Sequence, residues 1–149
     1  MDTNVLKRFA QASRILLQNK VHSKIDLVLH EESAARRENL KAVKELENKI
    51  HSNGKDKVAE QVAYTWFNRF TALQYMDMNG YNRVRVIAPL EGQTRPEILS
   101  EASAGSFDSD LVSENTQNIV RSLLDGRSAS RDPDNEAYRY LIVSVCNAW

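Results

Sequence analysis

Hydrophobic residues recur at intervals of three and four along most of the chain, which is the spacing of one face of an α-helix. The strongest such pattern covers residues 58–79. The apolar positions along one of its faces are Val58, Val62, Trp66, Phe70, Leu73 and Met76. Its other faces also carry apolar residues, and a helix that is apolar nearly all round is normally covered by neighbouring helices. We therefore expect a buried central helix at 58–79, ended by Asn79-Gly80.

Weaker helical patterns flank this central stretch. The expected elements before it are a helix from Thr3 or Asn4, a break at 19–23, a short helix at 24–30, and a helix at 33–50 with a narrow apolar seam. The expected elements after it are a brief helix opened by Pro96, a helix capped within 109–113 and ended by Gly126, and a final helix opened by Asp132-Pro133.

One segment departs from the helical period. Residues 83–87 alternate polar and apolar side chains, which predicts a short extended segment. A single strand makes no sheet, so this segment either pairs with a strand elsewhere or stays irregular. The expected fold is accordingly all-α, with six or seven helices around residues 58–79, one short extended segment at 83–87, and a single domain over residues 1–149.

The final helix carries apolar residues up to its last position. Its expected inner face consists of Tyr138, Leu141, Ile142, Val145 and Trp149, and neither Gly nor a basic residue marks an end. We interpret this pattern as a section of a longer chain. The alternative is a natural terminus with Trp149 packed in the core.

The composition limits the possible functions of the chain but does not identify one. The formal net charge is zero, from 20 basic and 20 acidic residues, so overall charge gives no argument for nucleic acid. All lysines lie before residue 58, which hints at a basic face in that part. Cys146 is the single cysteine, and no apolar run approaches the length of a bilayer span. These features suit a reducing cytoplasm, without a disulfide or a membrane partner.

A distinctive string lies in the central stretch. The sequence AYTWFNRFTALQYMDMNGY at 63–81 is followed by RVRVIAP at 83–89 and by RPEIL at 95–99. This order is similar to the amino-terminal region of the PglX family, the adenine-specific DNA methyltransferases of the bacterial BREX phage-defence system. Members of that family are several times longer than this chain.

The resemblance implies a role within a larger enzyme. It implies an amino-terminal helical domain that braces the methyltransferase centre or contacts DNA or other BREX proteins. S-adenosylmethionine would be the cofactor of the parent chain, with DNA and the methyltransferase domain as partners of this piece, in the bacterial cytoplasm. The alternative is a stand-alone helical adaptor that recognises a protein.

The motifs of adenine methylation are missing from the sequence itself. There is no Asn/Asp-Pro-Pro-Tyr/Phe loop, and no Gly-rich turn follows a strand. His22, His30 and His51 are too scattered in sequence for a metal site. We therefore expect no catalytic, cofactor-binding or metal-binding residue in this piece, and no activity of the piece alone.

Candidate contact residues come from two cationic groups. Arg37, Lys41 and Lys44 share one face of the predicted helix at 33–50, with Arg36 near its end, and such a face can neutralise phosphates. Interleaved glutamates favour an ordinary solvated face instead. Arg83 and Arg85 project from one side of the extended segment and can reach DNA or pair with carboxylates across a domain seam.

A polar pair interrupts the central apolar helix. Asn68 and Arg69 lie in the family string, where they can form an internal hydrogen-bond network or contact a neighbouring domain. The aromatic residues around them can stack on bases in principle, but their helical spacing favours the core.

Overall fold

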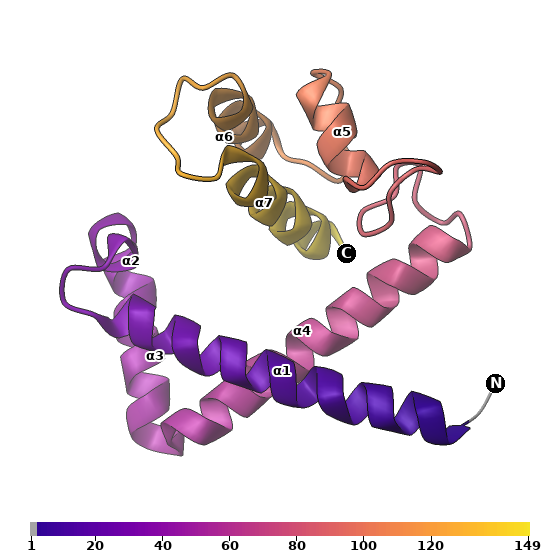
Figure 1. Cartoon of the computed structure of the whole chain (residues 1–149). Coiled ribbons are helices and arrows are strands. Elements are labelled where there is room, and N and C mark those ends of the chain that lie inside the picture. Colours follow the sequence, from indigo (N-terminus) through magenta and orange to yellow (C-terminus); the bar gives the residue numbers. More distant parts are fainter. Residues whose placement is uncertain (1–2) are drawn as a thin grey trace. The chain divides into compact units, whose positions relative to one another are not determined.

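The computed structural model describes residues 3–149, which form seven helices and no β-strand (Figure 1). The helices are α1 (Thr3–Leu29), α2 (Ala34–Glu38), α3 (Leu40–Asn53), α4 (Lys55–Met78), α5 (Glu97–Ser103), α6 (Glu114–Leu124) and α7 (Pro133–Ala148). The expectation of an all-α fold with six or seven helices is confirmed. By its contacts the chain divides into two compact units, the first ending at Asn68 and the second running from Arg69 to Trp149. The single domain stays a prediction.

The first helix is longer than the sequence pattern predicted. α1 continues through residues 19–23, where we expected a break, and merges with the short helix expected after it. Within this stretch, Ser23 donates its hydroxyl to the carbonyl of Asn19 one turn earlier (3.1 Å). Ile25 is buried and packs with Val58 and Ala59 in the core of the first unit. The predicted break was wrong because packing of this face outweighs the modest helix propensity of residues 19–23.

Two helices replace the single one predicted at 33–50. Asn39 lies between α2 and α3 with φ −148° and ψ 71°. Its backbone N–H donates to the carbonyl of Ala35, and its side-chain oxygen accepts from the amide of Ala42 (3.1 Å). One residue therefore ends one helix and caps the next. α3 stops before Gly54, whose φ of 85° lets α4 begin directly after the turn.

The core of the first unit joins α1 to α3 and α4. Its buried centre of Ile25, Val58 and Ala59 is surrounded by the half-buried residues Val21, Leu29, Leu46, Ile50 and Val62. An ion pair reinforces the same junction at its edge, where Lys55 contacts Asp26. Nearby, His22 lies 3.5 Å from the Asp56 carboxylate. Figure 1 shows the carboxy-terminal end of α1 next to α2 and α3.

The second unit is built around α7, which packs along α6 and against α5. The buried apolar residues of these helices and of the loop before α6 are Ile98, Leu99, Ala102, Val112, Val120, Leu123, Ala137, Leu141, Ile142 and Val145. Asp132 caps α7 by accepting from the amide of Asn135 (3.1 Å), as Asp132-Pro133 predicted. Trp149 does not join the inner face of α7, because its side chain is 74% exposed.

The central helix has nearly the predicted bounds, but it is not covered on all sides. α4 buries Val58, Ala59 and Ala63 in its first half and Leu73 in its second, while Trp66 is half-buried. The exposed large side chains on this helix are Tyr64, Phe70, Tyr75 and Met78. The expectation of burial all round was therefore wrong. The apolar pattern of a helix does not show how many neighbouring helices can cover it. The first half of α4 belongs to the first unit, and the second half belongs to the second unit.

Candidate functional site

The cationic face predicted in the first unit is only partly preserved. Arg37, Lys41 and Lys44 are all exposed, but the break at Asn39 places Arg37 on α2 and the two lysines on α3. The three residues therefore do not share one continuous helix. They remain candidates for phosphate contact, because exposed cations keep their charge available to an anionic partner.

Arg36 has a different position from its neighbours. Its guanidinium donates to the carbonyl of Leu29 at the end of α1 (3.0 Å) and pairs with the carboxylate of Glu47 on α3. The side chain is 24% exposed. Arg36 thus satisfies an orphan helix carbonyl and ties α1 to α3, which are structural tasks.

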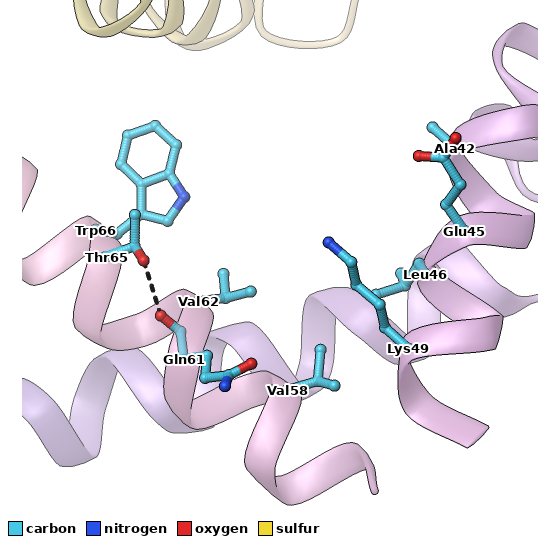
Figure 2. Close-up of a pocket in the computed structure, with 9 residues that line it drawn as sticks. All are labelled: Ala42, Glu45, Leu46, Lys49, Val58, Gln61, Val62, Thr65 and Trp66. Carbon is cyan, nitrogen blue, oxygen red and sulfur yellow. Dashed lines mark hydrogen bonds between the residues drawn. The ribbon is translucent and has the colours of Figure 1, made fainter. Parts of the chain in front are cut away.

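A groove of about 370 Å³ lies between α3 and α4 in the first unit (Figure 2). Its lining residues are Ala42, Glu45, Leu46, Lys49, Val58, Gln61, Val62, Thr65 and Trp66. Figure 2 shows Val62, Thr65 and Trp66 of α4 on one side and Glu45, Leu46 and Lys49 of α3 on the other. The groove can accept an apolar group, and its rim holds one carboxylate and one ammonium group.

The arginines of residues 83–87 lie on an irregular segment, since no strand forms there. The guanidinium of Arg83 lies 3.6 Å from the largely buried carboxylate of Asp108, and Arg83 itself is 73% exposed. Arg85 donates its backbone N–H to Glu97 (3.1 Å) and its side chain to the carbonyl of Pro89 (3.3 Å). Both side chains reach solvent, so a further contact by either one stays a prediction.

A buried carboxylate holds this irregular segment in place. Asp77, in the last turn of α4, is 4% exposed. Its Oδ1 accepts from the side-chain amide of Asn82 (3.1 Å) and the backbone N–H of Val86 (3.0 Å). Its Oδ2 accepts from the backbone N–H groups of Ile87 (2.7 Å) and Ala88 (3.0 Å). Four donors thus fill the acceptor capacity of one carboxylate.

Tyr138 of α7 completes this arrangement, which we call the Asp77 network. Its hydroxyl donates to the carbonyl of Val86 (2.9 Å), so that both polar backbone groups of Val86 are satisfied by side chains. Burial and the nearby Asp77 carboxylate raise the pKa of Tyr138 to about 12. The Oδ1 of Asn82 is buried without a hydrogen-bond partner in the structure.

The internal polar network or domain contact expected at Asn68 and Arg69 stays a prediction. Asn68 is exposed, so it is not a buried member of a network, and Arg69 is half-buried. A buried polar centre is formed by Asp77 and Asn82, which the sequence pattern did not single out. The sequence did contain a signal for this centre, because Asp77 is an acidic residue in the last turn of an apolar helix, where the helix dipole disfavours negative charge. An acidic residue at such a position indicates that nearby hydrogen-bond donors stabilise it.

Other chemistry-bearing residues do not gather into a site. Within residues 3–149, no three His, Cys, Asp or Glu side chains are placed to hold a metal ion. Burial raises the pKa of Cys146, and the positive charge of Arg69 opposes that shift. No helix in the same range is long and apolar enough to cross a membrane.

By class, the described residues form an all-α protein with exposed cationic side chains and an internal polar network around Asp77. Two adenine-specific methyltransferases are similar to it in sequence. BrxX from Escherichia coli O9:H4 (strain HS) is 30% identical over 105 residues, which is 69% of this chain and 8% of BrxX. PglX from Lacticaseibacillus casei (strain Zhang) is 35% identical over 86 residues, which is 56% of this chain and 7% of PglX.

The chain is thus related to the PglX-like adenine-specific methyltransferases, and it spans less than a tenth of the length of these relatives. No family model matches the chain, and no solved structure matches it. The resemblance found in the string at 63–81 is confirmed at the level of this relationship.

The Asp77 network predicts a large loss of stability when its charge is removed. We expect Asp77→Asn to destabilise residues 82–88 by about 3 kcal/mol or more, because an amide nitrogen would face N–H donors and two charge-assisted hydrogen bonds would be lost. Amide hydrogen exchange of Val86, Ile87 and Ala88 measures this directly. The control Asp110→Asn, at an exposed position, should change exchange by no more than about 0.5 kcal/mol. Equal protection in both variants would contradict the network.

The raised pKa of Tyr138 predicts a stability that depends on pH in the alkaline range. The unfolded chain ionises this phenol near pH 10, whereas the folded chain does so near its pKa of about 12. The contribution of Tyr138 is therefore complete below pH 10 and is lost as the pH rises through 12. Urea unfolding of the wild type and Tyr138→Phe should show a free-energy difference that is constant below pH 10 and shrinks above it. A difference that grows above pH 10 is the opposite sign and refutes the assignment.

Proposed function

We propose that this chain is a helical part of a BREX PglX-like adenine-specific DNA methyltransferase, of the amino-terminal kind, that acts in host DNA methylation and phage defence. The observation that carries the proposal is the relationship over 69% of the chain to a methyltransferase that is more than ten times longer than the matched part. A match that covers most of this chain and little of the relative is the pattern of one part of a multi-part enzyme. The relationship favours this reading over a stand-alone adaptor.

In this role the chain supports the chemistry rather than performing it. Its sequence has no Asn/Asp-Pro-Pro-Tyr/Phe loop and no Gly-rich turn after a strand, which an adenine methyltransferase centre requires. S-adenosylmethionine belongs to the remainder of the parent enzyme. The two helical units brace that remainder or contact DNA and other BREX proteins, in the bacterial cytoplasm.

The decisive experiment is made in the organism that carries the gene. We expect mass spectrometry to find these residues in a polypeptide several times longer than 149 residues, and deletion of codons 3–149 in frame to abolish or sharply reduce genomic adenine methylation. A polypeptide that ends at Trp149 with unchanged methylation supports the adaptor instead. As a check on the cofactor assignment, calorimetry of the 149-residue chain with S-adenosylmethionine should give no binding signal. Micromolar binding would place the cofactor site in this chain.

The exposed cations of the first unit predict a salt-dependent contribution to DNA binding. Replacing Arg37, Lys41 and Lys44 by Ala in the parent enzyme should weaken duplex binding at low salt. The slope of log affinity against log salt should fall in magnitude by about 0.9 for each lost phosphate contact. Binding titrations at several salt concentrations measure this slope.

The matched control removes an equal charge from the second unit. Arg127, Arg131 and Arg139 are exposed, and their replacement by Ala should leave the slope near the wild-type value. An unchanged slope after replacing Arg37, Lys41 and Lys44 would remove these residues from the DNA interface.

A further inference from the structure

A cleft of about 350 Å³ lies in the second unit, between the loop at 109–113 and the second half of α7. Its lining includes Asp110 and Leu111 of the loop and Tyr140, Val143 and Asn147 of α7. All of these residues belong to the second unit, so the two walls are placed relative to one another. The volume is near the lower end of the range for ligand sites, which suits a single side chain. We call this feature the Asp110 cleft.

Hydrogen bonds hold the two walls of the Asp110 cleft together. The hydroxyl of Ser144 on α7 donates to the carbonyl of Leu111 (3.0 Å) and accepts from the backbone N–H of Ser113 (3.4 Å). Within the loop, the backbone N–H of Asp110 donates to the carboxylate of Asp108 (3.1 Å). The walls are therefore fixed before a ligand arrives, which lowers the entropic cost of binding one.

The cleft carries negative charge. Asp110 is exposed, and no basic side chain within residues 3–149 forms an ion pair with it. The stretch 96–120, which includes the loop, contains no lysine or arginine. Its acidic residues are Glu97, Glu101, Asp108, Asp110 and Glu114.

The cations of the second unit that lie nearest to this stretch do not line the cleft. Arg83 pairs with Asp108, and Arg121 lies over the ring of Phe107 (4.8 Å from guanidinium carbon to ring centroid). Arg139 lines an adjoining hollow on α7. A cationic ligand is therefore complementary to the cleft.

The other lining groups indicate which cation fits. Leu111 and Val143 offer apolar surface to a methylene stem, and Val143 is 42% exposed. Tyr140 supplies an aromatic ring, on which a planar guanidinium can stack. The carboxylate of Asp110 and the amide oxygen of Asn147 are acceptors for the several N–H donors of a guanidinium. These groups together match an arginine side chain.

Other ligands fit the cleft less well. A phosphate would be attracted by the amino terminus of α6 at Ser113 but repelled by Asp110 and Glu114. Within residues 3–149, no three His, Cys, Asp or Glu side chains are placed to hold a metal ion. An ammonium group has fewer donors than a guanidinium and no plane to stack on Tyr140.

We propose that the Asp110 cleft binds an arginine side chain of a protein partner. The guanidinium lies at Asp110 and Tyr140, and the methylene stem lies along Leu111 and Val143. Free arginine is disfavoured, because its own carboxylate would come close to Asp110 and Glu114. This contact does not rest on the proposed methyltransferase role.

A short peptide tests the proposal with the whole chain. The probe is a Gly/Ser peptide, blocked at both ends, with one central arginine. We expect it to shift the amide NMR signals of Asp110, Leu111 and Asn147, with a Kd of about 1 mM, which is reasonable for one side chain in a small cleft. The same peptide with citrulline, which keeps the shape but has no charge, should bind at least about tenfold more weakly. A lysine peptide should bind about threefold more weakly than the arginine peptide.

A pair of variants tests the assignment to this cleft. Asp110→Asn removes the carboxylate and should weaken binding of the arginine peptide about tenfold, because a charge-assisted hydrogen bond is lost. The matched control is Glu91→Gln, at an exposed carboxylate that does not line the cleft, and its affinity should stay within about twofold of wild type. The amide spectrum of each variant verifies that the chain still folds.

Several results would overturn the proposal. These are no shifts at the cleft with the arginine peptide, equal binding of the citrulline or lysine peptide, or equal effects of Asp110→Asn and Glu91→Gln. Free arginine that binds more tightly than the peptide would indicate a small-molecule site and refute a protein partner. Inorganic phosphate that shifts the same signals at lower concentration would show that the cleft prefers anions.

Discussion

The second unit depends on one buried carboxylate, which accepts the backbone hydrogen bonds that a neighbouring strand would accept in a β-sheet. Residues 82–88 leave the helical path, and their backbone N–H groups need acceptors once they are buried. The carboxylate of Asp77 supplies these acceptors to Val86, Ile87 and Ala88, and Asn82 donates a fourth hydrogen bond. A buried carboxylate is costly without such partners, so the segment and the charge stabilise each other. Neither the helix end nor the loop would hold its position alone.

Charged side chains elsewhere either form contacts within the fold or are exposed to solvent. Arg36 satisfies a carbonyl at the end of α1 and pairs with Glu47, while the adjacent Arg37 stays exposed. In the second unit, Arg83 lies at the nearly buried Asp108 with most of its side chain in water. Basic residues that look equivalent in the sequence therefore have different roles in the structure. Only the exposed ones are available to a partner.

The exposed features suit a part of a larger assembly. The exposed apolar residues of α1, the groove between α3 and α4, and the exposed aromatic residues of α4 together leave considerable apolar surface for contacts. A relationship to methyltransferases that are far longer than this chain is consistent with such surfaces. The proposed roles assign the catalytic chemistry to the remainder of the parent enzyme and the binding surfaces to this piece.

The sequence by itself determined the all-α class, the bounds of α4 and the start of α7, because helical spacing and capping residues such as Asp132 act over one or two turns. It also carried the string that points to PglX-like methyltransferases. Only the tertiary structure decided that α1 runs unbroken, since Ile25 is held by residues of α4 more than thirty positions away. It also decided that Asp77 and Asn82 form a buried polar centre. The donors that make Asp77 stable come from the loop at 82–88, and Tyr138 of α7 donates to the carbonyl of Val86 in that loop. No local pattern in the sequence records that these segments meet.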